Sequence, residues 1–468
     1  MQRILLILIA LLLAAPLAAQ TPAPATPPAG ALAPAELDEL RASFTPDAAT
    51  RAIMNAVATQ STRTLAQDRA TVNTTDHLFS HRIKTEGVTD QKSSGRCWLF
   101  AGLNILRPVA MTSLNTQGFE FSQNFLTFYD KLEKANLFLE SIIATRTRSV
   151  DDRDVEWLLK NPMPDGGQWN HALALIEKYG VVPSDIMPET ESSSSTAQMN
   201  SILSTLLRKD ASILRARPAA TDGDLRTQKA TMLREVYRVL ALHLGVPPTD
   251  FTWRAKLKDG TISTSTRYTP REFYAKHVGL KLADYVCLHS VPVHPFEKTY
   301  TIRYDRNLFD QPDMRFVNLP FERIREYTLK SVRANEPVWF GCDVGKESDS
   351  KLGVMRRGLY DYTALYGIDL TMTKADRVRY QESIPSHAMV IIGVDMDGDK
   401  PAKWLVENSW GTKAGNNGLF AMYDSWFEEY TYSVIIHKKF LPAEVTRLLA
   451  ETPVELGPWD PMFATDPR

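Results

Sequence analysis

Apolar residues recur at helical spacing through the first half of the chain. Leu99, Leu103, Leu106 and Val109 lie three or four positions apart, which places their side chains on one face of an α-helix. We therefore predict a buried helix that opens at Cys97. The same spacing predicts three more helices, at residues 35–71, 123–143 and 171–179, the last of them ended by a glycine.

The pattern changes after about residue 281, where short runs rich in β-branched and aromatic residues predict strands. The predicted strands are residues 285–289, 300–304, 338–342, 389–394, 404–406 and 419–422. A helical half followed by a strand-rich half indicates an α+β fold. A cleft between two such halves is a natural place for a site.

Two segments interrupt this plan. Residues 198–280 are mostly helical in pattern, contain a Pro-Pro break, and are predicted to be an insertion. Residues 188–196 are polar and serine-rich, which predicts a surface loop.

The N-terminus carries the pattern of a secretory signal peptide. Arg3 precedes an unbroken apolar run at residues 4–13, and small residues follow up to Ala19, where we predict cleavage. The apolar run is too short to span a bilayer. Residues 20–34 form a Pro/Ala-rich linker. We expect an exported protein, periplasmic or secreted, with no later membrane helix and no lipid anchor.

Composition narrows the function classes. The chain has 468 residues, 44% of them apolar, and a formal net charge of −1, so nothing draws it to nucleic acid or to a membrane surface. Its three cysteines are too few for a disulfide scaffold, and we expect Cys287 and Cys342 to be small buried hydrophobes. No cluster with metal-ligand spacing and no phosphate-binding glycine loop occurs, so we expect no metal and no cofactor.

Cys97 has the setting of a reactive thiol. It follows a glycine-containing turn and opens the apolar helix, where the helix dipole favours a thiolate. Gln91, six residues upstream, is placed to donate a hydrogen bond to an oxyanion.

The rest of a cysteine-hydrolase site lies in the second half of the chain. His387 heads one predicted strand, and Asn408 ends the next. Antiparallel neighbours would bring the two together, so that the Asn oxygen accepts the His ring N–H and fixes its orientation. Trp410 is placed to shield that hydrogen bond from water.

The order Gln, Cys, His, Asn is that of the papain-like cysteine peptidases. The chain resembles the bleomycin hydrolase and aminopeptidase C branch of that superfamily from about residue 60 to its end. The matching motifs are KSSGRCWLF (92–100), FSQNFL (121–126), DGGQW (165–169), IEKYGV (176–181), TW (252–253), FY (273–274), WFGCDVGK (339–346), LYD (359–361) and WDPM (459–462).

The resemblance implies roles for the candidate residues. Cys97 would be the nucleophile, His387 the general base and then acid, and Asn408 its orienting partner. Gln91 and the Cys97 backbone N–H would form the oxyanion hole, and the substrate-binding candidates are Gly166, Gly167, Trp410, Asp466 and Arg468.

The implied fold is a papain-like domain over residues 35–468, with a helical left lobe, a β-rich right lobe and the helical insertion at about 198–280. A C-terminal arm at about 453–468 would lie in the cleft and receive the free amine of a peptide substrate, making the protein an aminopeptidase. The family also assembles as a homo-hexamer.

The tail leaves other functions open. Residues 463–468 are FATDPR, where family tails usually carry Gly-Ala-Leu-Ala. If this arm does not block the cleft, the same site would serve a papain-like endopeptidase or a cysteine acyltransferase. A second alternative is a non-catalytic papain-like binding module, which the intact Cys, His and Asn disfavour.

Overall fold

The computed structural model describes residues 28–85 and 87–463. The predicted signal peptide, most of the linker, Asp466 and Arg468 lie outside these residues. The chain divides into two compact units, one ending at Leu65 and the other beginning at Ala66.

The first unit contains the helices α1 (Pro34–Ser43), α2 (Ala48–Thr59) and α3 (Thr62–Leu65). The single helix predicted for residues 35–71 is therefore wrong. The helix is interrupted between α1 and α2. There the Asp47 side chain accepts a hydrogen bond from the Thr50 N–H and caps α2.

The helical half of the second unit contains the predicted helices that begin at Cys97, at residue 123 and near residue 171, and two short helices, α4 (Arg69–Asn73) and α7 (Arg153–Lys160), that were not predicted as separate elements. The predicted helices are α5 (Cys97–Leu114), α6 (Gln123–Thr145) and α8 (Trp169–Tyr179). Gly180 ends α8 with a φ of 75°, and a Cβ there would lie 2.3 Å from the backbone of Pro270, so only glycine fits.

Helix α5 runs through the core. In the part of the chain that the structure describes, it is the one helix long and apolar enough to cross a membrane, and 78% of that stretch is buried inside the fold. The sequence analysis expected no membrane helix after the N-terminal segment. Burial in the core accounts for the apolar composition of α5.

The insertion is helical except for one hairpin that the sequence analysis missed. It contains α10 (Ala197–Arg215), α11 (Asp222–Leu244), β2 (Phe251–Trp253), β3 (Thr266–Tyr268) and α12 (Pro270–His277). The short helix α9 (Glu191–Ser194) precedes it, in the segment predicted to be a surface loop. The antiparallel strands β2 and β3 form a small sheet of their own.

The second half of the chain builds one twelve-stranded sheet in the order β14-β5-β6-β4-β13-β7-β10-β11-β12-β9-β8, with β1 (His81–Arg82) also paired to β10. Its other strands are β4 (Tyr285–His289), β5 (Lys298–Ile302), β6 (Arg315–Asn318), β7 (Val338–Cys342), β8 (Ser348–Asp349), β9 (Val354–Met355), β10 (His387–Asp397), β11 (Lys400–Glu407), β12 (Leu419–Tyr423), β13 (Thr431–His437) and β14 (Val454–Leu456).

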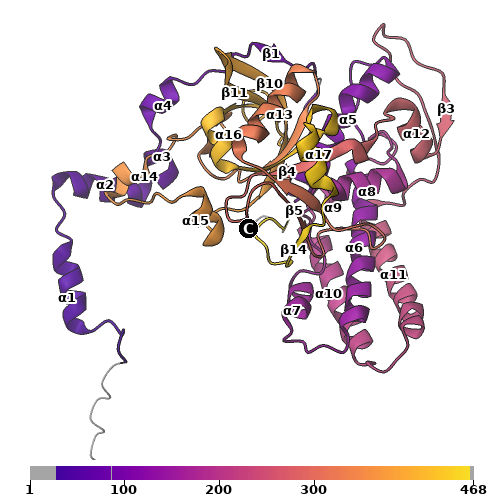
Figure 1. Ribbon diagram of the computed structural model, residues 1–468, viewed down its shortest axis with the longest axis horizontal. Coiled ribbons are helices and arrows are strands. Elements are labelled where there is room, and N and C mark those ends of the chain that lie inside the picture. Colours follow the sequence, from indigo (N-terminus) through magenta and orange to yellow (C-terminus); the bar gives the residue numbers. More distant parts are fainter. Residues whose placement is uncertain (1–27, 86, 464–468) are drawn as a thin grey trace, which may run out of the picture. The chain divides into compact units, whose positions relative to one another are not determined.

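The helices of this half are α13 (Phe321–Arg333), α14 (Tyr362–Tyr366), α15 (Lys374–Arg379), α16 (Asp424–Tyr430) and α17 (Ala443–Ala450), with short 3₁₀ turns at Leu282–Asp284 and Lys438–Phe440. Of these, α13, α16 and α17 pack against the sheet. Within the second unit, the purple and magenta helices α6, α10 and α11 gather away from the orange strands β10 and β11 (Figure 1). This α+β arrangement has the helical part and the strand-rich part that the sequence predicts.

Helix α5 packs against β10 and β7 and so joins the two halves. The first residue of α5 is Cys97, and the first residue of β10 is His387. The fold therefore brings a helix N-terminus and a strand start to the same place.

Candidate active site

The predicted His–Asn pair is formed. The His387 Nε2–H donates to Asn408 Oδ1 at 2.8 Å, because β10 and β11 are antiparallel neighbours and Asn408 directly follows β11. Asn408 Oδ1 also accepts the Ser409 N–H at 2.8 Å, which fixes the amide orientation. With the proton on Nε2, the other ring nitrogen of His387 is left as an acceptor.

Cys97 and His387 line one small cavity of about 30 Å³, with residues from both halves of the fold around it. The backbone N–H of Ala388, next to His387, hydrogen-bonds to the Cys97 thiol. Trp410 stacks on the imidazole of His387 with ring centroids 4.8 Å apart and an angle of 30° between the planes. Trp410 thus lies against the imidazole, and its expected role of shielding the His387–Asn408 hydrogen bond from water stays a prediction.

The pKa of the Cys97 thiol is raised, whereas the sequence analysis expects it to be lowered. Burial raises the pKa of Cys97 to about 11, and this outweighs the backbone N–H groups of Ala388, Trp98 and Cys97, which lower it. Burial lowers the pKa of His387 to about 4, against the opposing effect of its hydrogen bond to Asn408. Without substrate, desolvation thus favours a neutral thiol and a neutral imidazole.

Gln91 is held close to the same group of residues. Its backbone N–H donates to the Ser409 carbonyl at 2.8 Å, and its side-chain Oε1 accepts from Ser409 Oγ at 2.6 Å. Its Nε2 donates to the Ser94 carbonyl at 2.6 Å. That nitrogen carries two hydrogens, so one bond to Ser94 is compatible with a second bond to an oxyanion.

Gly166 and Gly167 line the cavity that holds Cys97 and His387, as predicted. A Cβ on Gly167 would lie 2.5 Å from the ring of Trp98 and 2.9 Å from His171 Nδ1, so the close approach of backbone and core requires glycine.

No role was predicted for Asp165, whose buried side chain connects several segments of this region. Its buried carboxylate pairs with Lys131 at 2.6 Å and accepts the Gly95 N–H at 3.0 Å and Asn200 Nδ2 at 2.7 Å, and the Thr196 hydroxyl also donates to it. Burial acts to raise the pKa of Asp165, but the Lys131 charge and these hydrogen bonds hold it well below its usual range.

The prediction that residues 188–196 form a surface loop is partly wrong, because two of these residues make buried polar contacts. Thr196 is buried against Asp165, and Glu189 pairs with the buried guanidinium of Arg96 at 2.6 Å. The segment therefore braces the turn that leads into Cys97. An acidic residue and hydroxyls in a polar stretch carry no sequence signal for this role, because surface loops have the same composition.

The C-terminal segment reaches the edge of the cavity. Strand β14 pairs in parallel with β5, and beyond it Gln168 Nε2 donates to the Met462 carbonyl at 2.9 Å. Gln168 lines the cavity beside Gly167. The expected substrate-binding roles of Asp466 and Arg468 fall outside the described residues and stay predictions.

The other two cysteines, Cys287 and Cys342, lie in strands of the large sheet. Cys342 is fully buried in β7 and Cys287 is partly exposed in β4, and all three cysteines are free thiols. Among residues 28–85 and 87–463, no group of three His, Cys, Asp or Glu side chains is arranged to hold a metal ion.

Comparison with known proteins places this site in a family. Residues 31–463 match the Peptidase C1-like family. The chain belongs to this family. As a Peptidase C1-like protein with its cysteine, histidine and asparagine gathered in one site, it is a cysteine-type peptidase.

Similar proteins share most of its length. The chain is 41% identical to aminopeptidase C of Streptococcus thermophilus over 91% of this chain and 97% of that protein. It is 40% identical to bleomycin hydrolase of Homo sapiens over 85% of this chain and 90% of that protein.

The structural comparison agrees. The crystal structure of PepW from Lactobacillus rhamnosis HN001 has a TM-score of 0.90 to this Peptidase C1-like protein, at 40% identity, covering 93% of this chain and all of PepW. The papain-like α+β fold expected from the motifs is confirmed.

Proposed function

We propose that this protein is a cysteine-type aminopeptidase that is exported and that hydrolyses peptide bonds near free N-termini through a thioester acyl-enzyme. The observation that carries the chemistry is the shared cavity of Cys97 and His387, with Asn408 fixing the imidazole tautomer. Relatives named aminopeptidase C, about 40% identical over most of the chain, support the same reaction class.

The proposed reaction starts with proton transfer. His387 takes the Cys97 proton on its acceptor ring nitrogen, and the thiolate attacks the substrate carbonyl carbon. Although burial opposes each charge alone, the thiolate and imidazolium form together and attract each other at low dielectric, so the pair titrates as a unit. The Gln91 amide and the Cys97 backbone N–H would donate to the oxyanion.

Collapse of the tetrahedral intermediate breaks the C–N bond. His387 gives its proton to the leaving amine, and the acyl group stays on sulfur as a thioester. Water, deprotonated by His387, then attacks the thioester and releases the carboxylic acid and the Cys97 thiol.

The preference for free N-termini follows from the arm. The Gln168–Met462 hydrogen bond ties the C-terminal segment beside Gly167, where the unprimed part of a peptide would otherwise extend. Such an arm would leave room for few residues before the scissile bond.

The test compares free-amine and N-acetylated fluorogenic peptides with wild-type protein and Cys97→Ala. We expect free-amine peptides to be hydrolysed faster, and no hydrolysis with Cys97→Ala. Deleting residues 463–468 should raise cleavage of the N-acetylated peptides. Equal cleavage of both kinds of peptide by the wild type would indicate an endopeptidase. Transfer of the acyl group to an added amine would indicate an acyltransferase, and no turnover of either peptide would indicate a binding module.

Export rests on the sequence pattern of residues 1–19. Expression in a bacterial host followed by fractionation should place the protein outside the cytoplasm, with a mature N-terminus just after Ala19. Full-length protein confined to the cytoplasm would contradict export without affecting the peptidase proposal.

Assembly as a homo-hexamer is proposed from family resemblance alone. Light scattering on the purified protein should give about six times the chain mass. A monomer with full peptidase activity would contradict it.

A further inference from the structure

Strand β7 makes hydrogen bonds beside both catalytic residues. Trp339, which lines the catalytic cavity, donates its indole N–H to the Trp98 carbonyl at 3.2 Å, one residue beyond Cys97. At the end of β7, Cys342 lies opposite His387 in the antiparallel ladder with β10. The Cys342 side chain is fully buried, and its Sγ donates to the His387 carbonyl at 3.7 Å. A buried thiol other than Cys97 therefore contacts the backbone of the catalytic histidine.

One peptide group connects this thiol with Cys97. The carbonyl that Cys342 contacts belongs to His387, and the N–H of the same peptide group, that of Ala388, hydrogen-bonds to the Cys97 thiol. This peptide bond is trans, so its N–H and its C=O point in opposite directions. The two sulfur atoms therefore lie on opposite sides of one peptide group and communicate through it.

Cys342 stays a hydrogen-bond donor. A thiol donates weakly, and a thiolate does not donate at all. Burial raises the pKa of Cys342 well above its usual value, and the charge of Asp343 acts in the same direction. The Cys342 thiol is thus protonated at neutral pH. The His387 carbonyl has two lone pairs, so it can accept this S–H in addition to a backbone N–H of the sheet.

We propose that Cys342 is a positioning residue that stabilises the Cys97 thiolate through the His387–Ala388 peptide group. Hydrogen bonds in series polarise one another, so a donor on the carbonyl makes the N–H of the same peptide a stronger donor. An N–H that points at sulfur binds a thiolate more strongly than a thiol. Cys342 thus offsets part of the desolvation that raises the pKa of Cys97. The inference rests on the proposed function, since it adds a residue to the same reaction.

The other titratable groups around the two thiols come from three segments. His387 on β10 shares the catalytic cavity with Cys97. Burial raises the pKa of Cys97 most, and the Asp165 carboxylate, in the loop before α8, adds to this. Asp343 directly follows β7 and acts on Cys342. Substituting Cys342 leaves all three groups in place, so a change in the titration of Cys97 can be assigned to the lost or altered donor.

The test measures how fast iodoacetamide alkylates Cys97 as a function of pH, with mass spectrometry to identify the labelled cysteine. Cys342→Ala removes the donor and should move the midpoint of thiolate formation up by about 0.3 pH unit. Cys342→Ser supplies a stronger donor of similar shape and should move the midpoint down. A merely structural role would disturb the site in the same direction in both variants. Midpoints that shift in the same direction, or do not shift, would overturn the proposal.

Cys287→Ala and Cys287→Ser are the matched controls. Cys287 is a partly exposed thiol of β4 whose partner across the ladder is Ile435 in β13, and it does not line the catalytic cavity. Both variants should retain the wild-type midpoint. Shifts as large as those of the Cys342 variants would show that the titration responds to thiols anywhere in the sheet, and this too would overturn the assignment.

An infrared measurement tests the hydrogen bond without catalysis. In Cys97→Ala/Cys287→Ala protein, Cys342 carries the one remaining thiol. Its S–H stretching band should lie at a lower frequency than that of a free thiol in an apolar solvent, and adding Cys342→Ala should remove it. A band at the frequency of the free thiol would reject the inference, even if peptidase activity is established. A lowered band and opposite midpoint shifts, in a protein that hydrolyses no peptide, would instead reject the proposed function.

Discussion

Asn408 fixes the tautomer of His387 with one hydrogen bond, and that bond decides which ring nitrogen remains an acceptor. The sequence predicts this pair because both residues stand at strand ends in distinctive motifs. It does not predict the pKa values, because burial of the thiol and the imidazole depends on how α5 packs against β10 and β7.

Replacing Asn408 should therefore weaken catalysis without removing it. We expect Asn408→Ala to lower kcat by about tenfold to a hundredfold and to change KM little. This loss is smaller than the rate factor of about 10²–10⁴ that a general base itself contributes. Steady-state kinetics on a free-amine peptide provide the measurement. Asn417→Ala, at an exposed position, is the control and should retain full kcat.

At the level of elements, one carboxylate joins three segments that are distant in sequence. Asp165 links the turn before Cys97, helix α6 through Lys131, and the start of α10 through Thr196 and Asn200. The sequence predicts each helix but not this junction, since local periodicity carries no information about which polar residues meet in the core.

The central strand β13 was missed although its TYSVIIH run has the β-branched residues of a buried strand.

Removing the charge of Asp165 should destabilise this junction. Asp165→Asn leaves the buried Lys131 unpaired, which costs about 3–5 kcal/mol in the free energy of unfolding. Urea denaturation measures the change. Adding Lys131→Met to Asp165→Asn should recover much of the loss, because no buried charge then remains. If the single variant is as stable as the wild type, the ion pair does not stabilise the fold.

Across the whole molecule, buried neutral histidines link stability to pH. His289 in β4 is 1% exposed and stacks on Phe316 at 3.9 Å, and burial lowers its pKa to about 3. His387 is lowered to about 4 by the same cause. Since the unfolded chain takes up these protons near pH 6.5, the free energy of unfolding falls as the pH drops below that value.

The size of this effect is testable at His289. Each proton held only by the unfolded state costs about 1.4 kcal/mol per pH unit between pH 6.5 and pH 4. In His289→Phe, the slope of the free energy of unfolding against pH should be smaller by about that amount, as measured by urea denaturation at several pH values. A slope unchanged in His289→Phe would show that His289 is not the group responsible.

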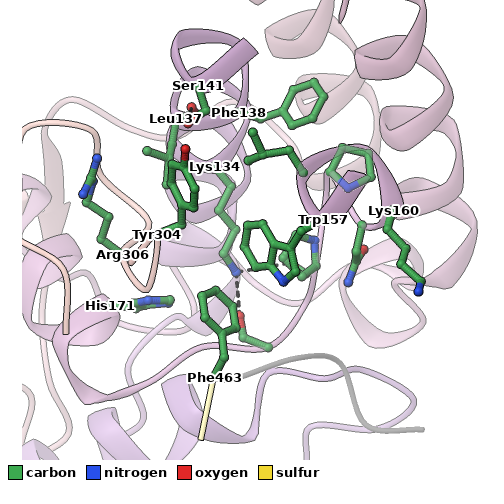
Figure 2. Close-up of a pocket in the computed structure, with 15 residues that line it drawn as sticks. Lys134, Leu137, Phe138, Ser141, Trp157, Lys160, His171, Tyr304, Arg306 and Phe463 are labelled. Carbon is green, nitrogen blue, oxygen red and sulfur yellow. Dashed lines mark hydrogen bonds between the residues drawn. The ribbon is translucent and has the colours of Figure 1, made fainter. Parts of the chain in front are cut away.

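At this scale the sequence predicts the fold class and the order of the lobes, because the motifs and the change from helical to strand periodicity extend over the whole chain. It does not predict that the chain divides into two compact units between Leu65 and Ala66. Nor does it predict the cavity of about 170 Å³ beside Gly166, which side chains from α6, α7 and the C-terminal segment enclose together (Figure 2).

The place of β13 also has a consequence for how the protein is made. This strand, close to the end of the chain, lies between β4 and β7, and β7 pairs with β10, which carries His387. A ribosome delivers Cys97 early and β13 late, so a nascent chain carries its thiol long before the sheet that supports the imidazole can close. We therefore expect peptidase activity to appear only when synthesis of the chain is nearly complete.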